Sequence, residues 1–388
     1  MIIQSILDTD SYKFTMQQFV LQHFPDRVVR YELIMRTPRK FSSDFYNMLL
    51  QEIREMSVLK LSSEERLFLS ECGLFKRSYL EYLQSYRFDP YEVMMTHTDD
   101  NLTLCIEGHW YRTILWEVPL MSLISELYFI NNPQERRNPS NISEKASLFE
   151  RLDVKFTDFG TRRRYSLEEQ NCVVNECIMK APHSFQGTSN PMLAQRYHCP
   201  MKGTQAHELY MAIAAMYGYN NANVIGMDKW IETYKGNLGI ALTDTFTTDV
   251  FLRDFDAKYS KIFDGVRQDS GDPIQFVNKM YLHYMHKGIN PMHKTIIFSD
   301  NLNPESVQRI HKFCQGQIND SYGIGTNLTN DVGVTPLNMV IKLTALKRVD
   351  GWVPTVKLSD NPEKHTGDAH EIKMCKLILN RRYDETDH

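Results

Sequence analysis

The chain has 388 residues, of which 42% are hydrophobic, 11% aromatic and 24% charged. This composition is typical of a globular protein and excludes a disordered chain, which would be poorer in aromatic residues. The formal net charge of −4 argues against generic nucleic-acid binding, because such binding needs a basic surface that displaces counterions. A local basic pocket for a phosphorylated small molecule remains compatible with this charge.

Cysteine usage and the N-terminal sequence indicate the compartment. The seven cysteines are scattered and include no C-x-x-C pair, which favours free thiols in a reducing compartment over disulfides or a zinc site. Asp8 and Asp10 stand where a signal peptide needs a basic start and an apolar stretch. Residues 113–130 are apolar but are interrupted by two glutamates and a proline, so we expect no membrane span there. The expected location is the cytoplasm.

The first third of the chain mixes helical and strand patterns. Helical patterns cover residues 12–24 and three further segments between residues 44 and 86. Strand patterns cover residues 28–35, 93–95 and 102–106, the last two flanking an Asp-Asp-Asn turn typical of a hairpin. We therefore expect a smaller mixed α+β domain over residues 1–125.

From about residue 150, short apolar strands alternate with helical runs. The strand patterns are at residues 154–159, 239–243, 265–266, 295–299 and 318–324. This alternation implies a parallel sheet built from βα units. We expect an α/β fold with an irregular parallel α/β barrel over residues 126–345, the alternative being an open doubly wound sheet. Residues 339–348 and 352–358 predict a hairpin around Asp350-Gly351, and we expect residues 346–388 to pack on the smaller domain or the barrel.

Nearly every predicted strand of the second half ends in a polar cluster. The clusters are Asp158 with residues 160–164, then residues 243–245, 267–272, 299–301 and 323–327. In a parallel barrel the C-terminal ends of the strands converge on one face, where active sites lie. This succession of clusters predicts an enzyme site on that face.

Two of these clusters have residue types suited to anions. Glycines at 323 and 325 let backbone amides approach a phosphate and Thr326 adds a hydroxyl, although a plain tight turn has the same pattern. A guanidinium such as that of Arg162 binds carboxylate or phosphate through a bidentate fork, the alternative being a solvated basic turn.

Residues 267–273 place a cation and two carboxylates before a predicted helix. We assign function to Arg267 and Asp269, which suit a ribose, a phosphate or a Mg²⁺ ion on a polyphosphate. We expect Asp272 to cap the helix that Pro273 opens.

A histidine and three lysines remain open from the residues alone. His207 opens a helical run, where it is either a satisfied structural residue or an imidazole that accepts a phosphoryl group. The lysines at 342, 357 and 364 either reach nucleotide phosphates or are ordinary surface lysines. The residues thus indicate an enzyme for a phosphorylated, ribose-containing substrate without identifying the reaction.

Seven motifs in order carry a resemblance to a known family. They are Asp8-Thr-Asp10-Ser11-Tyr12-Lys13, Asp158-Phe-Gly160-Thr-Arg162-Arg-Arg164, Gly187-Thr-Ser189-Asn190, Gly203-Thr-Gln-Ala-His207-Glu208, Gln268-Asp-Ser-Gly-Asp-Pro273, Phe298-Ser-Asp300-Asn301 and Gly323-Ile-Gly325-Thr326. In this order they resemble nicotinate phosphoribosyltransferases, over residues 6 to about 364. The resemblance implies a type II phosphoribosyltransferase fold and a homodimer with shared active sites. Nucleic acid and membrane are not expected partners.

The resemblance also implies a reaction. Nicotinate, phosphoribosyl pyrophosphate, ATP and water would give nicotinate mononucleotide, pyrophosphate, ADP and phosphate, the first step of NAD salvage from nicotinic acid. Mg²⁺ would neutralise the departing pyrophosphate. His207 would be phosphorylated by ATP, and Asp244 would orient its imidazole. Glu208 would be a helix-surface or supporting residue.

The resemblance further assigns the residues that bind substrate. Phe159 would stack on the pyridine ring, with Tyr12 reaching the other face from a partner subunit. Arg162 would bind near the nicotinate carboxylate. Ser189 stands where nicotinamide-using relatives look to have an aspartate, so a repelling charge is absent and the acid is the expected substrate. The ribose and phosphates would be held by Arg267, Asp269, Asp300, Gly325 and Thr326.

Three other functions are compatible with the fold class. Nicotinamide phosphoribosyltransferase predicts the same fold and differs only in the base, and Ser189 argues against it. Quinolinate phosphoribosyltransferase shares the fold class but gives His207 no purpose. A non-catalytic nucleotide-binding barrel would be expected to have lost Arg162, His207, Asp269 or Asp300, and all four are present.

Overall fold

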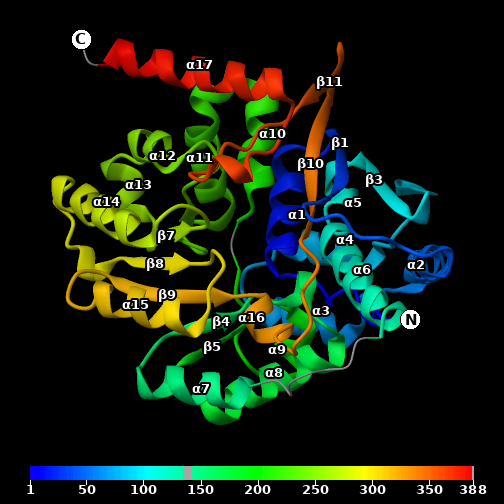
Figure 1. The fold of residues 1–388 in the computed structure, drawn as a ribbon. Coiled ribbons are helices and arrows are strands. Elements are labelled where there is room, and N and C mark those ends of the chain that lie inside the picture. Colours follow the sequence, from blue (N-terminus) through cyan, green and yellow to red (C-terminus); the bar gives the residue numbers. More distant parts are fainter. Residues whose placement is uncertain (134–140, 204, 387–388) are drawn as a thin grey trace.

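A computed structural model describes residues 1–133, 141–203 and 205–386, with side chains described as far as residue 381. Thr204, within the predicted Gly203–Glu208 motif, lies outside the described residues. The described chain forms a five-stranded antiparallel sheet and a six-stranded parallel sheet. Figure 1 shows the two sheets in separate lobes, with helix α1 (Tyr12–His23) between them.

The antiparallel sheet has the strand order β11-β10-β1-β3-β2. Its strands are β1 (Val28–Met35), β2 (Val93–Thr98), β3 (Asn101–His109), β10 (Met339–Arg348) and β11 (Gly351–Pro354). The two predicted hairpins both form, and the long β10 pairs with β1 from Met339 to Leu346. The domain boundary that we expected at residue 345 therefore falls inside a strand that belongs to the N-terminal sheet.

Helices cover this sheet and connect it to the second lobe. They are α2 (Ser43–Glu55), α3 (Ser63–Glu71), α4 (Arg77–Ser85), α5 (Trp110–Thr113) and α6 (Glu117–Asn131). The Ser42 and Ser62 side chains cap α2 and α3 by accepting from backbone amides. Residues Trp110–Asn131 are long and apolar enough to cross a membrane by length and composition, which we had not expected, but 83% of the apolar window is buried inside the protein. The apolar surface of this segment is therefore used in packing.

The parallel sheet has the order β5-β4-β9-β8-β7-β6. Its strands are β4 (Phe156–Asp158), β5 (Phe185–Thr188), β6 (Ile240–Leu242), β7 (Gly265–Gln268), β8 (Thr295–Phe298) and β9 (Asn319–Ile324). This confirms the parallel α/β class predicted from the strand–helix alternation. The edge strands β5 and β6 do not pair with each other in the described part of the chain, so the barrel is incomplete.

The helices of the second lobe follow the predicted rhythm. They are α7 (Ile142–Arg151), α8 (Leu167–Lys180), α9 (Pro191–Tyr197), α10 (His207–Tyr217), α11 (Ala222–Tyr234), α12 (Thr248–Asp254), α13 (Ala257–Ile262), α14 (Pro273–His286), α15 (Pro304–Cys314), α16 (Thr326–Thr329) and α17 (Ala369–Thr386). Asp272 caps α14 by accepting from the Gln275 amide at 2.8 Å, as predicted. All seven cysteines are free.

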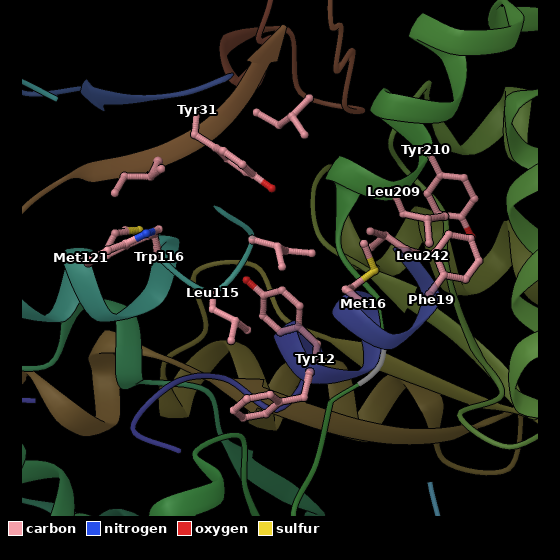
Figure 2. Packing of buried hydrophobic residues seen from close by; sticks show 14 of the residues in the cluster. Tyr12, Met16, Phe19, Tyr31, Leu115, Trp116, Met121, Leu209, Tyr210 and Leu242 are labelled. Atoms are coloured by element: carbon pink, nitrogen blue, oxygen red, sulfur yellow. The ribbon is translucent and has the colours of Figure 1, made fainter. Parts of the chain in front are cut away.

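Helix α1 packs between the lobes and fixes the N-terminal segment at the parallel sheet. Figure 2 shows Met16 and Phe19 of α1 beside Leu209 and Tyr210 of α10, all of them buried. Just before α1, the amide of Ser11 donates to the carbonyl of Ser189 at 2.7 Å. Because of this packing, residues 8–13 lie against the C-terminal ends of β4 and β5.

Candidate active site

A cavity of about 740 Å³ opens at the C-terminal ends of the parallel strands. Its walls there include Asp10, Tyr12, Phe159, Arg162, Ser189 and Arg267. The cavity continues along one face of the sheet to the opposite end of the strands, where Lys155, His311 and Asn319 line it. It therefore gathers side chains from two of the predicted polar clusters, through Arg162 and Arg267, and from the start of the chain.

Tyr12 and Phe159 both line this cavity from one chain. We had expected Tyr12 to arrive from a partner subunit. The bond between Ser11 and Ser189 and the burial of Lys13 hold Tyr12 against its own chain's strand ends, with only 8% of Tyr12 exposed. Tyr12 and Phe159 of one chain are thus both available to a flat ring bound in this cavity.

A glycine lies directly beneath the ring of Phe159. A Cβ atom built on Gly323 would come within 2.3 Å of two carbons of that ring. Gly325 follows at the end of β9, and Thr326 begins the short helix α16 beside the same turn. The glycine motif therefore gives the aromatic ring its space as well as providing a phosphate-sized turn.

Arg162 is held by a carboxylate that we had not assigned to the site. Its Nε lies 3.2 Å from Oδ2 of Asp10, and the Ser189 hydroxyl donates to Oδ1 of the same group at 2.6 Å. Burial raises the pKa of Asp10, opposed by the attraction of Arg162. Asp10 was visible only as part of an N-terminal motif, since nothing in the sequence indicates that it meets residues 162 and 189.

His207 lies at the start of α10 in a buried cluster beside the cavity. Its Nε2 is 3.0 Å from Oδ2 of Asp269 and 2.8 Å from Nζ of Lys357, and its Nδ1 is 3.0 Å from Oγ1 of Thr245. Asp244 Oδ1 is 3.8 Å from Nε2. Arg267, which lines the cavity, donates to Asp269 at 2.8 Å and so connects the two parts of the site.

The His207 imidazole is uncharged at neutral pH. Burial, aided by the nearby Lys357 ammonium, lowers the pKa of His207 to about 4. Nε2 has a donor, the Lys357 ammonium, and an acceptor, the Asp269 carboxylate, within hydrogen-bond distance. In the tautomer whose Nδ1–H donates to Thr245, Nε2 presents its lone pair to Lys357. A neutral imidazole with an available lone pair is the nucleophilic form.

Comparison with known proteins agrees with this geometry. A sequence model of the nicotinate phosphoribosyltransferase (NAPRTase) family matches residues 154–384, and one of that family's N-terminal domain matches residues 7–125. The chain belongs to the nicotinate phosphoribosyltransferase family. It is 46% identical to the nicotinate phosphoribosyltransferase of Chromohalobacter salexigens, with 97% of this chain and 98% of that protein covered.

Solved structures of the nicotinate phosphoribosyltransferase family have the same fold. The crystal structure of nicotinate phosphoribosyltransferase from Porphyromonas gingivalis matches with a TM-score of 0.94 at 40% identity, covering 98% of this chain and 100% of that one. One from Vibrio cholerae matches with a TM-score of 0.91 at 33% identity, covering 98% and 94%. Full-length similarity of this kind confirms the fold class and the enzyme family expected from the seven motifs.

The three lysines left open by the sequence all lie at the site of this family member. Lys357 contacts His207, and Lys364 forms an ion pair with Asp300 and donates to the Asp269 carbonyl at 3.1 Å. Lys342 on β10 is half-buried near Lys357 and Arg162, and its desolvation together with these two cations lowers its pKa to about 7. An amine beside two permanent cations is suited to receive a phosphate.

Several charged residues near the site have structural contacts. Arg164 is fully buried and forms a two-point ion pair with Asp8, at 2.6 and 2.8 Å. Burial lowers the pKa of Arg163 to about 10, with a further contribution from Arg162. Glu208 is buried rather than on the helix surface, and it contacts the equally buried Lys13. Glu208 is thus the supporting residue that we had named as one of two possibilities.

Proposed function

We propose that this chain joins nicotinate to phosphoribosyl pyrophosphate and couples that step to ATP through a phosphohistidine at His207. The observation that carries the proposal is the cluster around His207, directly behind a cavity with two aromatic walls and an arginine. Nicotinate phosphoribosyltransferase activity follows from the family, whereas the ATP coupling rests on the residues around His207.

The glycosyl step requires little beyond positioning and charge. A bond forms between the pyridine nitrogen and C1′ of the ribose, while the C1′–oxygen bond breaks and pyrophosphate leaves with its electrons. Tyr12 and Phe159 would orient the ring, and Arg162 would attract its carboxylate. Arg267, Lys342 and Lys364 would stabilise charge that develops on the leaving group. Gly325 and Thr326 would hold the 5′-phosphate, and Asp300 would contact the ribose.

The coupling step uses the neutral imidazole. A bond forms between Nε2 of His207 and the γ-phosphorus of ATP, while the phosphorus–oxygen bond to ADP breaks. Lys357 would give up its hydrogen bond to the Nε2 lone pair and form an ion pair with the transferred phosphoryl group. Asp244 and Asp269 would attract positive charge as it develops on the ring. Water later cleaves the nitrogen–phosphorus bond and releases phosphate.

Mg²⁺ is a proposed cofactor whose ligands the residues around His207 can supply. His207, Asp244 and Asp269 offer ligand atoms within 4.8 Å of one another. Asp244 Oδ1 is buried and has no hydrogen-bond donor among the described residues, so a cation would satisfy it. We propose that Asp244 and Asp269 hold the ion together with phosphate oxygens, which Mg²⁺ prefers as ligands. When bound, the ion supplies neutralisation of phosphate charge.

Two further parts of the proposal concern assembly and location. We propose a cytoplasmic enzyme, in keeping with the free thiols. A homodimer with shared sites remains a prediction, although this chain supplies Tyr12 to its own cavity. Light scattering of the purified protein tests the dimer.

The decisive experiment is a product assay with nicotinate or nicotinamide, each with and without ATP. Nicotinate mononucleotide formed faster with ATP would support both substrate and coupling. Product from nicotinamide alone would favour the nicotinamide enzyme, and absence of any product would favour a non-catalytic barrel. Labelled phosphate on the protein after exposure to [γ-³²P]ATP tests the phosphohistidine directly.

A further inference from the structure

Lys13 is a fully buried cation between two buried glutamates. Its ammonium pairs with Glu208 at 2.7 Å and with Glu117 at still closer range. Burial acts to lower the pKa of Lys13, but the attraction of the two glutamates outweighs it and raises that pKa. The group therefore stays charged, and three helices, α1, α6 and α10, meet at one ammonium.

One side of this cluster leads to the phosphorylation site. Glu208 directly follows His207 in the first turn of α10. Besides Lys13, the Glu208 carboxylate has the Tyr31 hydroxyl at 3.4 Å. The Glu208 side chain, which contacts Lys13, is therefore attached to the backbone directly next to His207.

The other side leads to the base pocket. Glu117 lies 4.0 Å from NH1 of Arg162, and it also attracts Lys342. Arg162 in turn is held by Asp10 and lies over the Tyr12 ring, with its guanidinium carbon 6.0 Å from the ring centre. Tyr12 is the chain neighbour of Lys13. Both walls of the pocket, aromatic and cationic, are thus tied to the same ammonium.

We propose that Lys13 is a positioning residue that couples the phosphorylation state of His207 to nicotinate affinity, acting through Glu208 on one side and Glu117 and Arg162 on the other. The proposal rests on the ATP coupling at His207 proposed above. Phosphorylation adds negative charge next to Glu208 and draws Lys357 and Lys342 towards it. The Lys13 ammonium then shifts its ion pairing between Glu208 and Glu117. Glu117 in turn determines how strongly Arg162 is drawn away from the substrate carboxylate.

Stability alone does not account for these charges. Buried ion clusters are often no more stabilising than apolar residues of the same volume, because desolvation offsets the attraction. A cluster of leucine and methionine side chains would hold the three helices together equally well. Paired charges, however, respond to a new charge nearby, and apolar side chains do not.

The test measures nicotinate KM with and without ATP for Lys13→Met, using the full-length enzyme. For the wild type we expect ATP to lower this KM several-fold, and for Lys13→Met we expect the ratio of the two KM values to fall to about one. Labelling from [γ-³²P]ATP should persist in the variant, because His207 and its contacts remain. Lys294→Met is the matched control, since Lys294 is also buried but donates to the Phe263 carbonyl away from the site.

Two outcomes separate this proposal from the one on which it rests. If ATP does not change the nicotinate KM of the wild-type enzyme, the coupling itself is overturned and this inference with it. A folded Lys13→Met with the wild-type ratio would overturn only the role of Lys13. If Lys13→Met does not fold, Glu208→Gln keeps the shape and an acceptor for Lys13 while removing the charge. An unchanged ratio in Glu208→Gln overturns the proposal, and a reduced ratio supports it.

Discussion

The Ser189 hydroxyl donates its hydrogen bond to Asp10, at 2.6 Å, and not into open space. The pocket therefore already holds one carboxylate, which Arg162 balances at 3.2 Å. Selectivity for nicotinate, which carries a carboxylate, then depends on the absence of a second protein carboxylate from the pocket. Position 189 is where such a group would lie.

Ser189→Asp is expected to shift preference from nicotinate towards nicotinamide. The new carboxylate would face Asp10 and repel the substrate carboxylate, while it could accept from an amide. We expect the ratio of kcat/KM values for the two bases to move by about 10- to 100-fold, the range of one specific polar contact. Ser189→Ala is the control, because it removes the hydroxyl without adding charge. If both variants keep the wild-type ratio, selectivity lies at Arg162.

His207→Ala is expected to keep a slow reaction without ATP and to lose stimulation by ATP. The base pocket lies outside the contacts of His207, so the glycosyl step persists. Product rates with and without ATP, compared with His283→Ala, check this. His283 contacts Ser260 at 3.0 Å, outside the catalytic cluster. Full stimulation in His207→Ala would contradict the phosphohistidine.

The low pKa of His207 predicts a specific loss of stability in acid. The pKa of His207 is about 4 in the folded chain, against an ordinary value of 6.5. Between these pH values His207 is therefore protonated in the unfolded chain and neutral in the folded chain. Stability should therefore fall as pH drops through this window, by up to about 3 kcal/mol at full shift. Urea unfolding of wild type and His207→Gln measures it. The glutamine variant, which does not titrate, should lose less stability over the same window.

Lys342 predicts a pH dependence of substrate binding near neutrality. Its pKa of about 7 means that the free enzyme loses this charge as pH rises through neutral values. KM for phosphoribosyl pyrophosphate should rise by up to about tenfold on the alkaline side, since bound phosphate needs the proton. In Lys342→Arg the charge persists, so this rise should vanish. An identical pH profile in both enzymes would exclude Lys342 from phosphate binding.

Gly323→Ala is expected to raise KM for nicotinate more than KM for phosphoribosyl pyrophosphate. Its methyl group would meet the Phe159 ring at 2.3 Å and push it into the cavity. Overpacking typically costs about 1–3 kcal/mol, so KM for nicotinate should rise by roughly tenfold or more. Equal effects on both substrates would mean that Phe159 does not stack on the base.

The local patterns predicted the fold well where a strand or helix is long and periodic. The helix predicted at residues 12–24 and the strand predicted at 28–35 appear almost as predicted. Strand β5 was missed, because Phe-Gln-Gly-Thr has no alternation of apolar residues and owes its extension to pairing with β4. The place of β10 was also missed, since a hairpin pattern gives no information about a third strand on its far side.

The candidate site was predicted from residues at strand ends, and its supporting residues were not. Arg267 and Asp269 lie at the end of β7, and His207 meets Asp269 from the start of α10. Lys13 and Glu117 lie on helices in the first third and have the sequence appearance of surface charges. Only the packing of α1 between the lobes buries them, and that packing has no local signature.

The pairing of β1 with β10 has a consequence for biosynthesis. β1 is made among the first 35 residues, yet one of its edges stays without a partner until residues 339–348 have left the ribosome. An open strand edge invites pairing with other chains, so nascent protein depends on protection during this interval. The same late segment carries Lys342 and precedes Lys357. A chain that stops before residue 339 therefore lacks two of the five strands of this sheet and both lysines.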